Sequence, residues 1–233
     1  MTVATVESRA AAACGCLIDK EEFTGMFIAF EGGDGVGKST QIHLLRDFLQ
    51  QRGCSVLLCR EPGSTQLGEQ IRDILLNQKS VAIDRMSELL LFMAARSQLT
   101  REVILPALGR GEVVLADRFL MSSIVYQGYA GGLDIEQLRT IGRIATANVE
   151  PDCTIILDAP VETGRARRSG TTQDRLESEN DAFHQRVREG FLAEAALFPE
   201  KTLVLSAVDS IENIQERIQQ HVTALLASQA CGE

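Results

Sequence analysis

The segment FEGGDGVGKSTQ, residues 30–41, constrains the fold of this chain more than any other stretch. It carries the pattern G-x-x-x-x-G-K-S and follows the apolar run MFIA, residues 26–29. In this pattern glycines let backbone N–H groups surround phosphate oxygens at the start of a helix, while the lysine reaches the outer phosphates and the serine hydroxyl a Mg²⁺ ion. We therefore expect a phosphate loop that binds a nucleotide through Gly32, Gly33, Asp34, Gly35, Val36, Gly37, Lys38, Ser39 and Thr40.

Short apolar runs alternate with longer amphipathic runs along the rest of the chain. Unbroken apolar strands separated by helices are typical of a parallel sheet covered on both faces. The expected strands are residues 25–31, 55–60, 111–118, 153–160 and 201–207, and the expected helices are residues 38–52, 66–76, 85–98, 101–108, 134–147, 175–198 and 210–228. We expect one α/β domain over residues 25–233, preceded by a poorly ordered extension, residues 1–24.

Composition narrows the partners and the compartment. The chain has 233 residues, a net charge of −9 and a pI near 5.0, which argues against a general affinity for nucleic acid or anionic membranes. No apolar stretch reaches the roughly 18 to 20 residues that span a bilayer, and the amino terminus lacks the pattern of a signal peptide. Cys14 and Cys16 could form a redox or metal pair, but the six scattered cysteines favour reduced thiols in the cytoplasm.

Asp117 ends the apolar run EVVLAD and is a candidate ligand for the metal ion. A carboxylate at the end of a strand beside a phosphate loop commonly points at the Mg²⁺ shell. Such a carboxylate can equally cap a helix. We expect Ser39 and Asp117 to hold Mg²⁺ together, because oxygen ligands suit this ion.

Groups suited to a phosphoryl acceptor follow the phosphate loop. Phe92 and Arg96 stand one helical turn apart, so a flat ring and a fork of donors share one face, although a core helix with one snorkelling arginine shows the same pattern. The segment GRARRSGTTQDR, residues 164–175, is rich in arginine, which is also typical of a solvated helix end. The guanine-specifying pattern NKxD is absent, which argues against a GTPase.

Five motifs together resemble the bacterial thymidylate kinases, from about Phe27 to the carboxyl end. They are FEGGDGVGKSTQ, REPG (60–63), LLLFMAAR (89–96), DRFLMSSIVYQG (117–128) and DRLE (174–177). The resemblance implies a P-loop NTPase three-layer sandwich, whose five-stranded parallel sheet has the order 2-3-1-4-5, with a mobile lid at about residues 165–176. It also implies phosphoryl transfer from MgATP to thymidine monophosphate (dTMP), giving dTDP and ADP in dTTP biosynthesis, and a cytoplasmic homodimer.

The resemblance also assigns the groups around the base and sugar of dTMP. Phe92 would stack on thymine and Arg96 would donate to its 4-carbonyl group. Tyr126 would lie against the sugar and exclude a 2′-hydroxyl. Ser123 and Gln127 would complete the contacts with the base and sugar.

The phosphate end of dTMP is assigned in the same way. Arg118, and more weakly Arg60, would hold the phosphate, and Asp34 would reach the 3′-hydroxyl and the phosphate surroundings. Glu61 and Pro62 match a turn that often holds a cis proline and shapes the pocket. Ser64 departs from the family, which usually has a second glycine there.

The resemblance places a catalytic arginine either in the phosphate loop or in the lid. This phosphate loop has no arginine, which favours the lid. We expect Arg168, and next Arg167, to act with Lys38, Asp34 and Arg118 in catalysis, and Arg175 to bind ATP and anchor the closed lid. The rival interpretations are a different nucleoside monophosphate kinase and a nucleotide-binding regulator whose acceptor site has lapsed.

Overall fold

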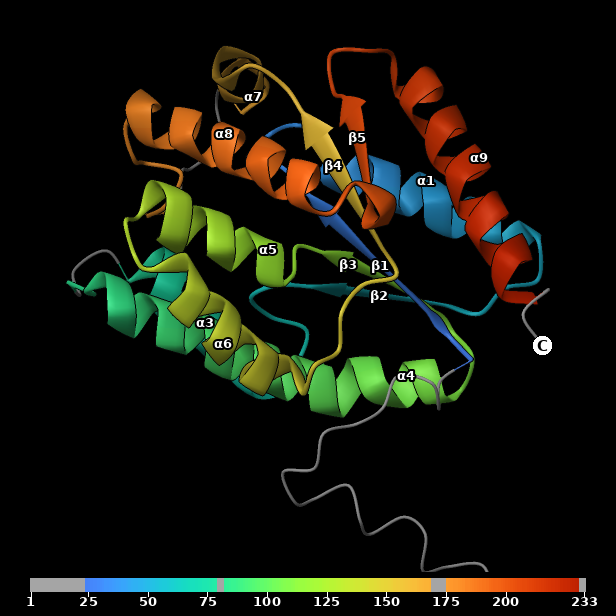
Figure 1. Cartoon of the computed structure of the whole chain (residues 1–233), viewed down its shortest axis with the longest axis horizontal. Helices are drawn as coiled ribbons and strands as arrows, with labels where there is room; N and C mark the ends of the chain where they lie inside the picture. The colour runs from blue at the N-terminus through green and yellow to red at the C-terminus, as the bar shows by residue number, and fades with distance from the viewer. Residues whose placement is uncertain (1–23, 79–81, 169–174, 231–233) are drawn as a thin grey trace, which may run out of the picture.

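The computed structural model describes residues 24–78, 82–168 and 175–230. Five parallel strands form one sheet in the order β2-β3-β1-β4-β5, which confirms the expected topology (Figure 1). The strands are β1 (Met26–Glu31), β2 (Val56–Arg60), β3 (Val113–Asp117), β4 (Cys153–Asp158) and β5 (Thr202–Ser206). The predicted extension, apart from residue 24, and the central part of the predicted lid, 169–174, lie outside the described residues.

The central strand β1 places the phosphate loop. All six of its residues are buried, as expected for a strand with a neighbour on each side and a helical layer on each face. Phe30 is in register with Asp117 of β3 and with Ile155 of β4. Because parallel strands end at the same edge of a sheet, the loop after β1 and the residues after β3 come together there.

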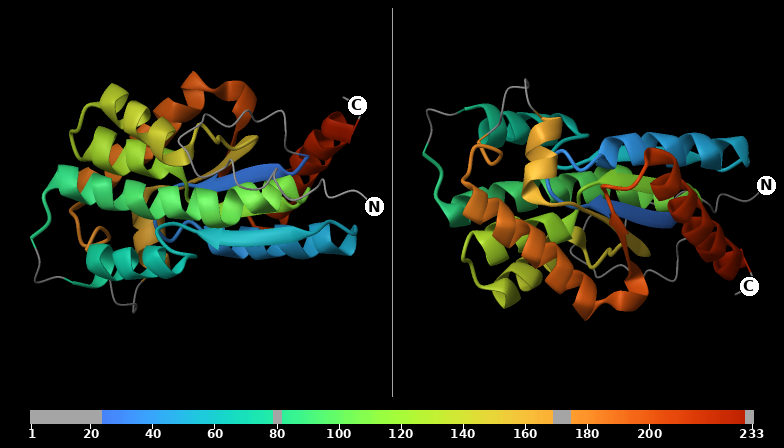
Figure 2. Two further views of the ribbon diagram at one scale, coloured as in Figure 1. Left: turned by 90° about the horizontal axis from the view of Figure 1, so that it is seen from below. Right: turned by 90° about the horizontal axis from the view of Figure 1, so that it is seen from above.

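Helices cover both faces of the sheet, as the views in Figure 2 show. Met26, Ile28 and Phe30 pack under α1 (Lys38–Gln51) and α9 (Ile211–Ala230). Phe27 and Ala29 point to the opposite face, where residues 99–108 cover them. The remaining helices of the described chain are α2 (Gln66–Arg72), α3 (Arg85–Leu99), α4 (Leu105–Gly109), α5 (Leu120–Ser123), α6 (Ile135–Thr146), α7 (Val161–Arg167) and α8 (Asp181–Leu197).

Several helical turns are wider or tighter than an α-helix. Three π-helical segments extend α2, α3 and α5, and a 3-10 turn precedes β5. The π-helical segment after α3 runs directly into α4, so the two helices expected at residues 85–98 and 101–108 form one continuous helical segment. The three π-helical segments are Asp73–Asn77, Thr100–Ile104 and Ile124–Ala130, and the 3-10 turn is Pro199–Lys201.

The long helix expected over residues 175–198 begins later than predicted. Residues 175–179 form turns, and α8 starts only after Asn180, whose side chain accepts a hydrogen bond of 2.9 Å from the Phe183 N–H. Asparagine is a strong helix N-cap, and this cap sets the boundary. Leu176 is buried against Phe92 and its neighbours, so tertiary packing holds the segment before the cap. Helix α7 and the helical turns over residues 120–130 were not predicted from the sequence.

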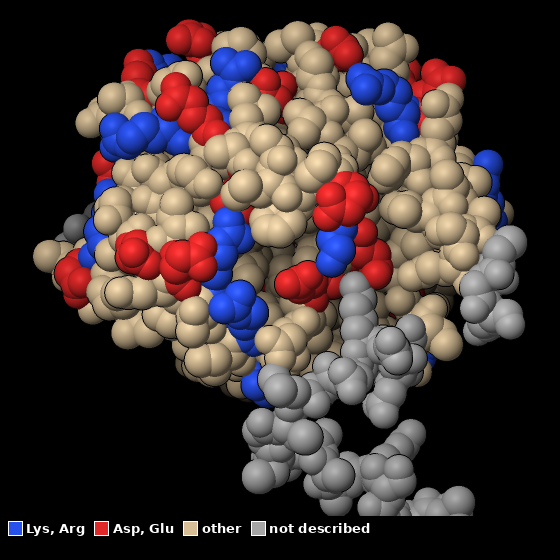
Figure 3. All heavy atoms as spheres, in the orientation of Figure 1, with Lys and Arg blue, Asp and Glu red and all other residues tan. Residues whose placement is uncertain are grey.

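No helix among residues 24–78, 82–168 and 175–230 combines the length and apolarity needed to cross a bilayer. On the face seen in Figure 3, acidic and basic side chains are intermixed and do not collect in an area of one sign.

Candidate active site

The phosphate loop joins β1 to α1 through left-handed glycines. Gly32, Gly35 and Gly37 have φ values of 127°, 75° and 99°. A Cβ atom on Gly32 would lie 2.4 Å from the Leu157 carbonyl oxygen on the neighbouring strand β4. Both the backbone conformation and this close approach therefore require glycine at position 32.

The Lys38 ammonium lies inside the phosphate loop. It donates hydrogen bonds to the carbonyl oxygens of Gly32 (3.2 Å) and Gly33 (2.7 Å). Burial and the nearby Arg118 charge lower the pKa of Lys38 to about 8, against the opposing effect of surrounding carboxylates. The cation is thus held in a partly desolvated position, where a phosphate group would gain strongly from its charge.

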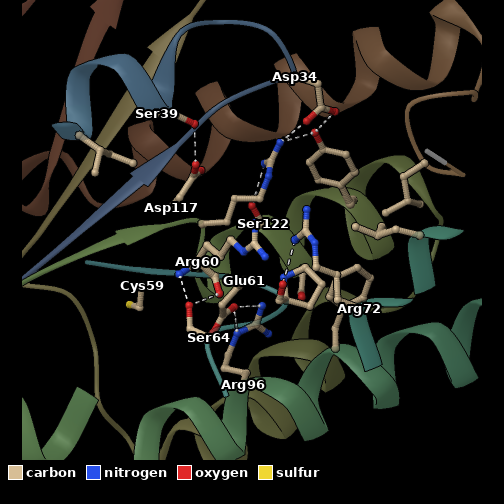
Figure 4. A pocket seen from close by; sticks show the side chains of 18 of the residues that line it. Asp34, Ser39, Cys59, Arg60, Glu61, Ser64, Arg72, Arg96, Asp117 and Ser122 are labelled. Carbon is tan, nitrogen blue, oxygen red and sulfur yellow. Dashed lines mark hydrogen bonds and ion pairs between the residues drawn. The ribbon is translucent and has the colours of Figure 1, made fainter. Parts of the chain in front are cut away.

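Ser39 and Asp117 meet beside the loop, as expected from the sequence. The Ser39 hydroxyl donates a hydrogen bond of 3.0 Å to Asp117 Oδ2, and both side chains are drawn together in Figure 4. Ser39 is exposed at the start of α1, and Asp117 ends β3. This pair presents oxygen ligands at the edge of the phosphate loop.

Arg118 connects the phosphate loop to the wall of the neighbouring cavity, which is described below. Its backbone is left-handed, with φ of 72°, and its guanidinium forms an ion pair with Asp34. It also donates to the Gly32 carbonyl oxygen and the Ser122 hydroxyl, each at 3.0 Å, and to the Tyr126 hydroxyl at 3.2 Å. One side chain thereby contacts both the loop and the cavity wall.

The Asp34 carboxylate is held charged by its surroundings. Tyr126 donates a hydrogen bond of 2.9 Å to Asp34 Oδ2. Burial alone would raise the pKa of Asp34, but the positive charges of Arg118 and Lys38 and the Tyr126 hydrogen bond outweigh it and hold the pKa well below its usual range. Asp34 is therefore an anion at neutral pH and does not serve as a proton donor.

Glu31 supports this arrangement and was missed from the sequence. Its fully buried carboxylate accepts hydrogen bonds from the Phe119 N–H (2.9 Å), the Ser122 N–H (3.1 Å) and the Ser122 hydroxyl. It thereby fixes the backbone that follows Arg118. Burial raises the pKa of Glu31, which the charge of Arg118 opposes. A carboxylate as the last residue of an all-buried strand was the available sequence signal.

A cavity of about 530 Å³ opens beside these residues. This volume is in the range of small-molecule sites. Figure 4 shows Asp34 and Ser39 on one side of it and Glu61 and Arg96 on the other. The structure brings together here the predicted acceptor residues Asp34, Arg60, Glu61, Pro62, Phe92, Arg96, Arg118, Ser123, Tyr126 and Gln127.

Arg96 is more deeply engaged than the sequence indicated. Its side chain is 1% exposed, and its guanidinium pairs with Glu61 at 2.7 Å. It also donates to the Phe119 carbonyl oxygen at 3.1 Å and to the Met93 sulfur at 3.2 Å. Burial raises the pKa of Glu61 to about 7, against the opposing charge of Arg96. Most of the Arg96 donors therefore serve to fix its plane at the cavity wall.

The REPG turn has the expected backbone. The Glu61–Pro62 peptide bond is cis. Ser64 is left-handed, with φ of 63°, and its hydroxyl accepts a hydrogen bond of 2.9 Å from the Arg60 N–H. This hydroxyl stabilises the turn where the family usually has glycine. The Arg60 side chain is 55% exposed and pairs with Glu69 at 3.0 Å.

The arginines of the predicted lid lie in different environments. Arg167 donates to the carbonyl oxygens of Val36 (3.4 Å) and Ala207 (2.9 Å). Arg168 pairs with Glu177 at 3.3 Å, and its Cγ atom lies 3.1 Å from the position of a Cβ on Gly35. Arg168 thus lies against the phosphate loop, and its catalytic role stays a prediction.

Arg175 lies beside α3 and the segment that follows α2. It donates to the Leu75 carbonyl oxygen at 3.0 Å and forms an ion pair with Glu88. These contacts are in keeping with an anchor for the lid segment. The predicted contact of Arg175 with ATP stays a prediction.

A parallel sheet of order 2-3-1-4-5, with a phosphate loop facing an acceptor cavity across an arginine, defines a P-loop nucleoside monophosphate kinase. Comparison with known proteins narrows this class. Residues 30–218 match the family model described as thymidylate kinase.

Two relatives and one solved structure illustrate the similarity. A thymidylate kinase of Caldanaerobacter subterraneus subsp. tengcongensis is 42% identical over 202 residues, covering 87% of this chain and 97% of the relative. One of Pelotomaculum thermopropionicum is 50% identical over 185 residues, covering 78% and 86%. The crystal structure of thymidylate kinase from Ehrlichia chaffeensis superposes with a TM-score of 0.70 at 33% identity, covering 85% of this chain and 98% of that one.

The chain belongs to the thymidylate kinase family. It is a nucleoside monophosphate kinase that phosphorylates dTMP to dTDP with ATP. This assignment replaces the two rival interpretations of the sequence, a nucleotide-binding regulator and a kinase for a different nucleoside monophosphate.

Proposed function

We propose that dTMP occupies the 530 Å³ cavity with its phosphate toward Arg118 and its base toward Phe92 and Arg96. The observation that carries this orientation is the ion pair between Arg118 and Asp34, because it lies at the junction of the cavity and the phosphate loop. The dTMP phosphate at this junction would lie beside the outer phosphate of ATP. Arg60, whose side chain reaches the same cavity, would exchange its exposed pair with Glu69 for the dTMP phosphate.

The base and sugar would fill the remainder of the cavity. Phe92 offers a ring for stacking, and Arg96 offers donors to the 4-carbonyl group of thymine. Tyr126 would face the sugar, with Asp34 near the 3′-hydroxyl, while Ser123 and Gln127 would complete the polar contacts. Glu61 and Pro62 close this end of the cavity, and the buried pair of Glu61 with Arg96 supports this role because it fixes the orientation of the guanidinium.

The donor nucleotide would bind along the phosphate loop, from Gly32 to Thr40. Backbone N–H groups and the amino end of α1 favour the phosphate charge, and Lys38 would transfer its hydrogen bonds from two carbonyl oxygens to the phosphates. These groups hold the reactants in line and stabilise charge, which is most of what phosphoryl transfer requires.

Ser39 and Asp117 would hold Mg²⁺. Their oxygen atoms, 3.0 Å apart, fit an ion that binds through one or two protein groups, phosphates and water. No cluster of three or more His, Cys, Asp or Glu side chains suited to a metal occurs in the described part of the chain, which suits an ion held largely by the nucleotide. The ion would neutralise charge on the transferring phosphate.

Arg168 would supply a further positive charge to the transferring group, with Arg167 as the second candidate. Its position against Gly35 of the phosphate loop supports this order. Arg167 is tied to two backbone carbonyl groups, which suits a supporting role for it. Arg175 would anchor the segment through Glu88 and contact ATP only after rearrangement.

Steady-state turnover of dTMP, dUMP, dCMP and GMP with MgATP tests the cavity assignment. We expect dTMP to react fastest and dUMP to follow within roughly 10- to 200-fold, because one methyl group in an apolar pocket is worth about 1 to 3 kcal/mol. Cytosine should be rejected more strongly because its amino group would face the Arg96 donors. Fastest turnover of GMP would overturn the assignment.

The homodimer and the cytoplasmic location are also proposals. Leu90 and Met86 on α3 are 51% and 37% exposed, which supports an apolar helix face as the dimer contact. Cys54, Cys59 and Cys153 are free thiols, in keeping with a reducing compartment. Light scattering of the purified chain, expected to give twice the monomer mass, tests the dimer.

A further inference from the structure

Glu88 is a buried carboxylate on the same helix as the residues assigned to the base. It stands one turn before Phe92 and two turns before Arg96 on α3, so the three side chains share one face. Its side chain has no exposed surface. A buried charge at such a place is costly unless its oxygens are paired, so its partners show what it does.

Three groups converge on Glu88. Gln127 Nε2 donates a hydrogen bond of 2.8 Å to Glu88 Oε1, and Arg85 approaches the same oxygen at 3.5 Å. Arg175 forms an ion pair with Oε2. The carboxylate therefore joins the cavity wall, through Gln127, to the segment of Arg175.

The hydrogen bond to Gln127 fixes the orientation of an amide. A carboxylate only accepts hydrogen bonds, so only the NH₂ end of the Gln127 amide can face it. Gln127 is 1% exposed and lines the cavity, so it has little freedom to turn over. Its carbonyl oxygen is then the end left for a ligand. A carbonyl oxygen at this place can accept a hydrogen bond from the N3–H group of thymine or uracil. The N3 atom of cytosine carries no hydrogen and is itself an acceptor, so the two atoms would repel each other.

The second oxygen of Glu88 holds the chain next to the base site. Arg175 is followed by Leu176, which is buried against Phe92, Ile71 and Leu75. Arg175 also donates to the Leu75 carbonyl oxygen at 3.0 Å. The segment that carries Arg175 therefore packs in the same apolar cluster as the ring assigned to stacking on the base, and Glu88 holds it there.

We propose that Glu88 is a positioning residue for pyrimidine recognition: it orients the Gln127 amide with its carbonyl toward the base, and with the same carboxylate it holds the Arg175–Leu176 segment in the apolar cluster of Phe92. This inference rests on the proposed position of the base in the cavity. Glu88 contacts neither substrate, so its effect is carried through Gln127 and Arg175.

The test is Glu88→Gln, assayed with dTMP and dCMP at saturating MgATP. An amide at position 88 can donate as well as accept, so it no longer fixes Gln127, and it cannot neutralise Arg175. We expect the KM for dTMP to rise at least about tenfold and the preference for dTMP over dCMP to fall at least about tenfold. Arg85→Met, which removes the other arginine near Glu88, should keep the wild-type preference.

The outcomes separate this inference from the proposed base site. If wild-type enzyme prefers dCMP or shows no preference, the base site itself is misplaced. If wild-type enzyme prefers dTMP and Glu88→Gln retains that preference with only a lower melting temperature, Glu88 is purely structural and the inference is wrong. Should Glu88→Gln fail to fold, Glu88→Asp, which keeps the charge but is one methylene shorter, should show the same loss of preference, and full retention of it would overturn the inference.

Discussion

The Ser39 hydroxyl and the Asp117 carboxylate lie 3.0 Å apart, which joins the first turn of α1 to the end of β3. We expect Asp117→Asn to lower kcat/KM for MgATP at least about a hundredfold, because the ion would lose its one charged protein ligand. Titration of activity with Mg²⁺ measures this. Asp158→Asn, at the end of β4 and paired with Arg188, is the matched control. An unchanged Mg²⁺ dependence in Asp117→Asn would contradict the assignment.

The binding of ATP should depend on pH through Lys38. Its pKa in the free enzyme is lowered to about 8 by burial and by Arg118, whereas bound phosphates favour the charged form. Above pH 8 the free ammonium loses its proton, so binding must take one up. We expect Kd for ATP to rise about tenfold from pH 7 to pH 9. Calorimetry at both pH values measures this, and Lys38→Arg, which stays charged, should flatten the dependence.

Substitution of two neighbouring arginines separates the candidates for the catalytic charge. Arg168→Ala should lower kcat at least about a hundredfold with little change in ATP affinity, because the charge acts on the transferring phosphate. Single-turnover kinetics measures this step. Arg165→Ala removes an exposed ion pair with Asp181 and should leave kcat unchanged. If Arg167→Ala loses kcat and Arg168→Ala does not, the order of the two arginines is reversed.

Gly32→Ala should destabilise the fold far more than the same substitution at a left-handed glycine that has free space around it. The new Cβ would lie 2.4 Å from the Leu157 carbonyl oxygen, and φ is 127°. Gly53 is the control, because it has φ of 83° with no atom within 4 Å of a Cβ. We expect Gly53→Ala to cost about 1 kcal/mol of unfolding free energy and Gly32→Ala at least about 2 kcal/mol more. Equal urea-unfolding midpoints for Gly32→Ala and Gly53→Ala would contradict this, because they would show that the phosphate loop moves to accept the methyl group.

The parts of the fold that local sequence determines were predictable. Unbroken apolar runs located all five strands, and the glycine pattern located the phosphate loop and Ser39. The order of the strands came from the resemblance, since nothing in a single strand encodes its neighbour. Asn180 is a local signal for the late start of α8, but the burial of Leu176, which holds the preceding residues, depends on residues of α2 and α3.

The roles of the supporting carboxylates could not be predicted. Glu31 lies inside the phosphate-loop motif and Glu88 directly precedes LLLFMAAR, but the motifs do not show what these carboxylates hold, because their partners come from distant parts of the chain. The same is true of Arg96, whose spacing from Phe92 was visible but whose pairing with Glu61 was not. Local patterns reveal groups that could meet a ligand, whereas the groups that hold them in place depend on the folded chain.

The central position of β1 has a consequence for how the chain is made. Among the five strands of this sheet it is synthesised first, yet it pairs with β3 and β4 and not with β2. Until residues 113–117 have been synthesised, this strand, apolar in five of its six residues, has no partner at either edge. A nascent chain arrested before that point would expose an aggregation-prone segment, so the centre of the sheet cannot form until β3 has been made.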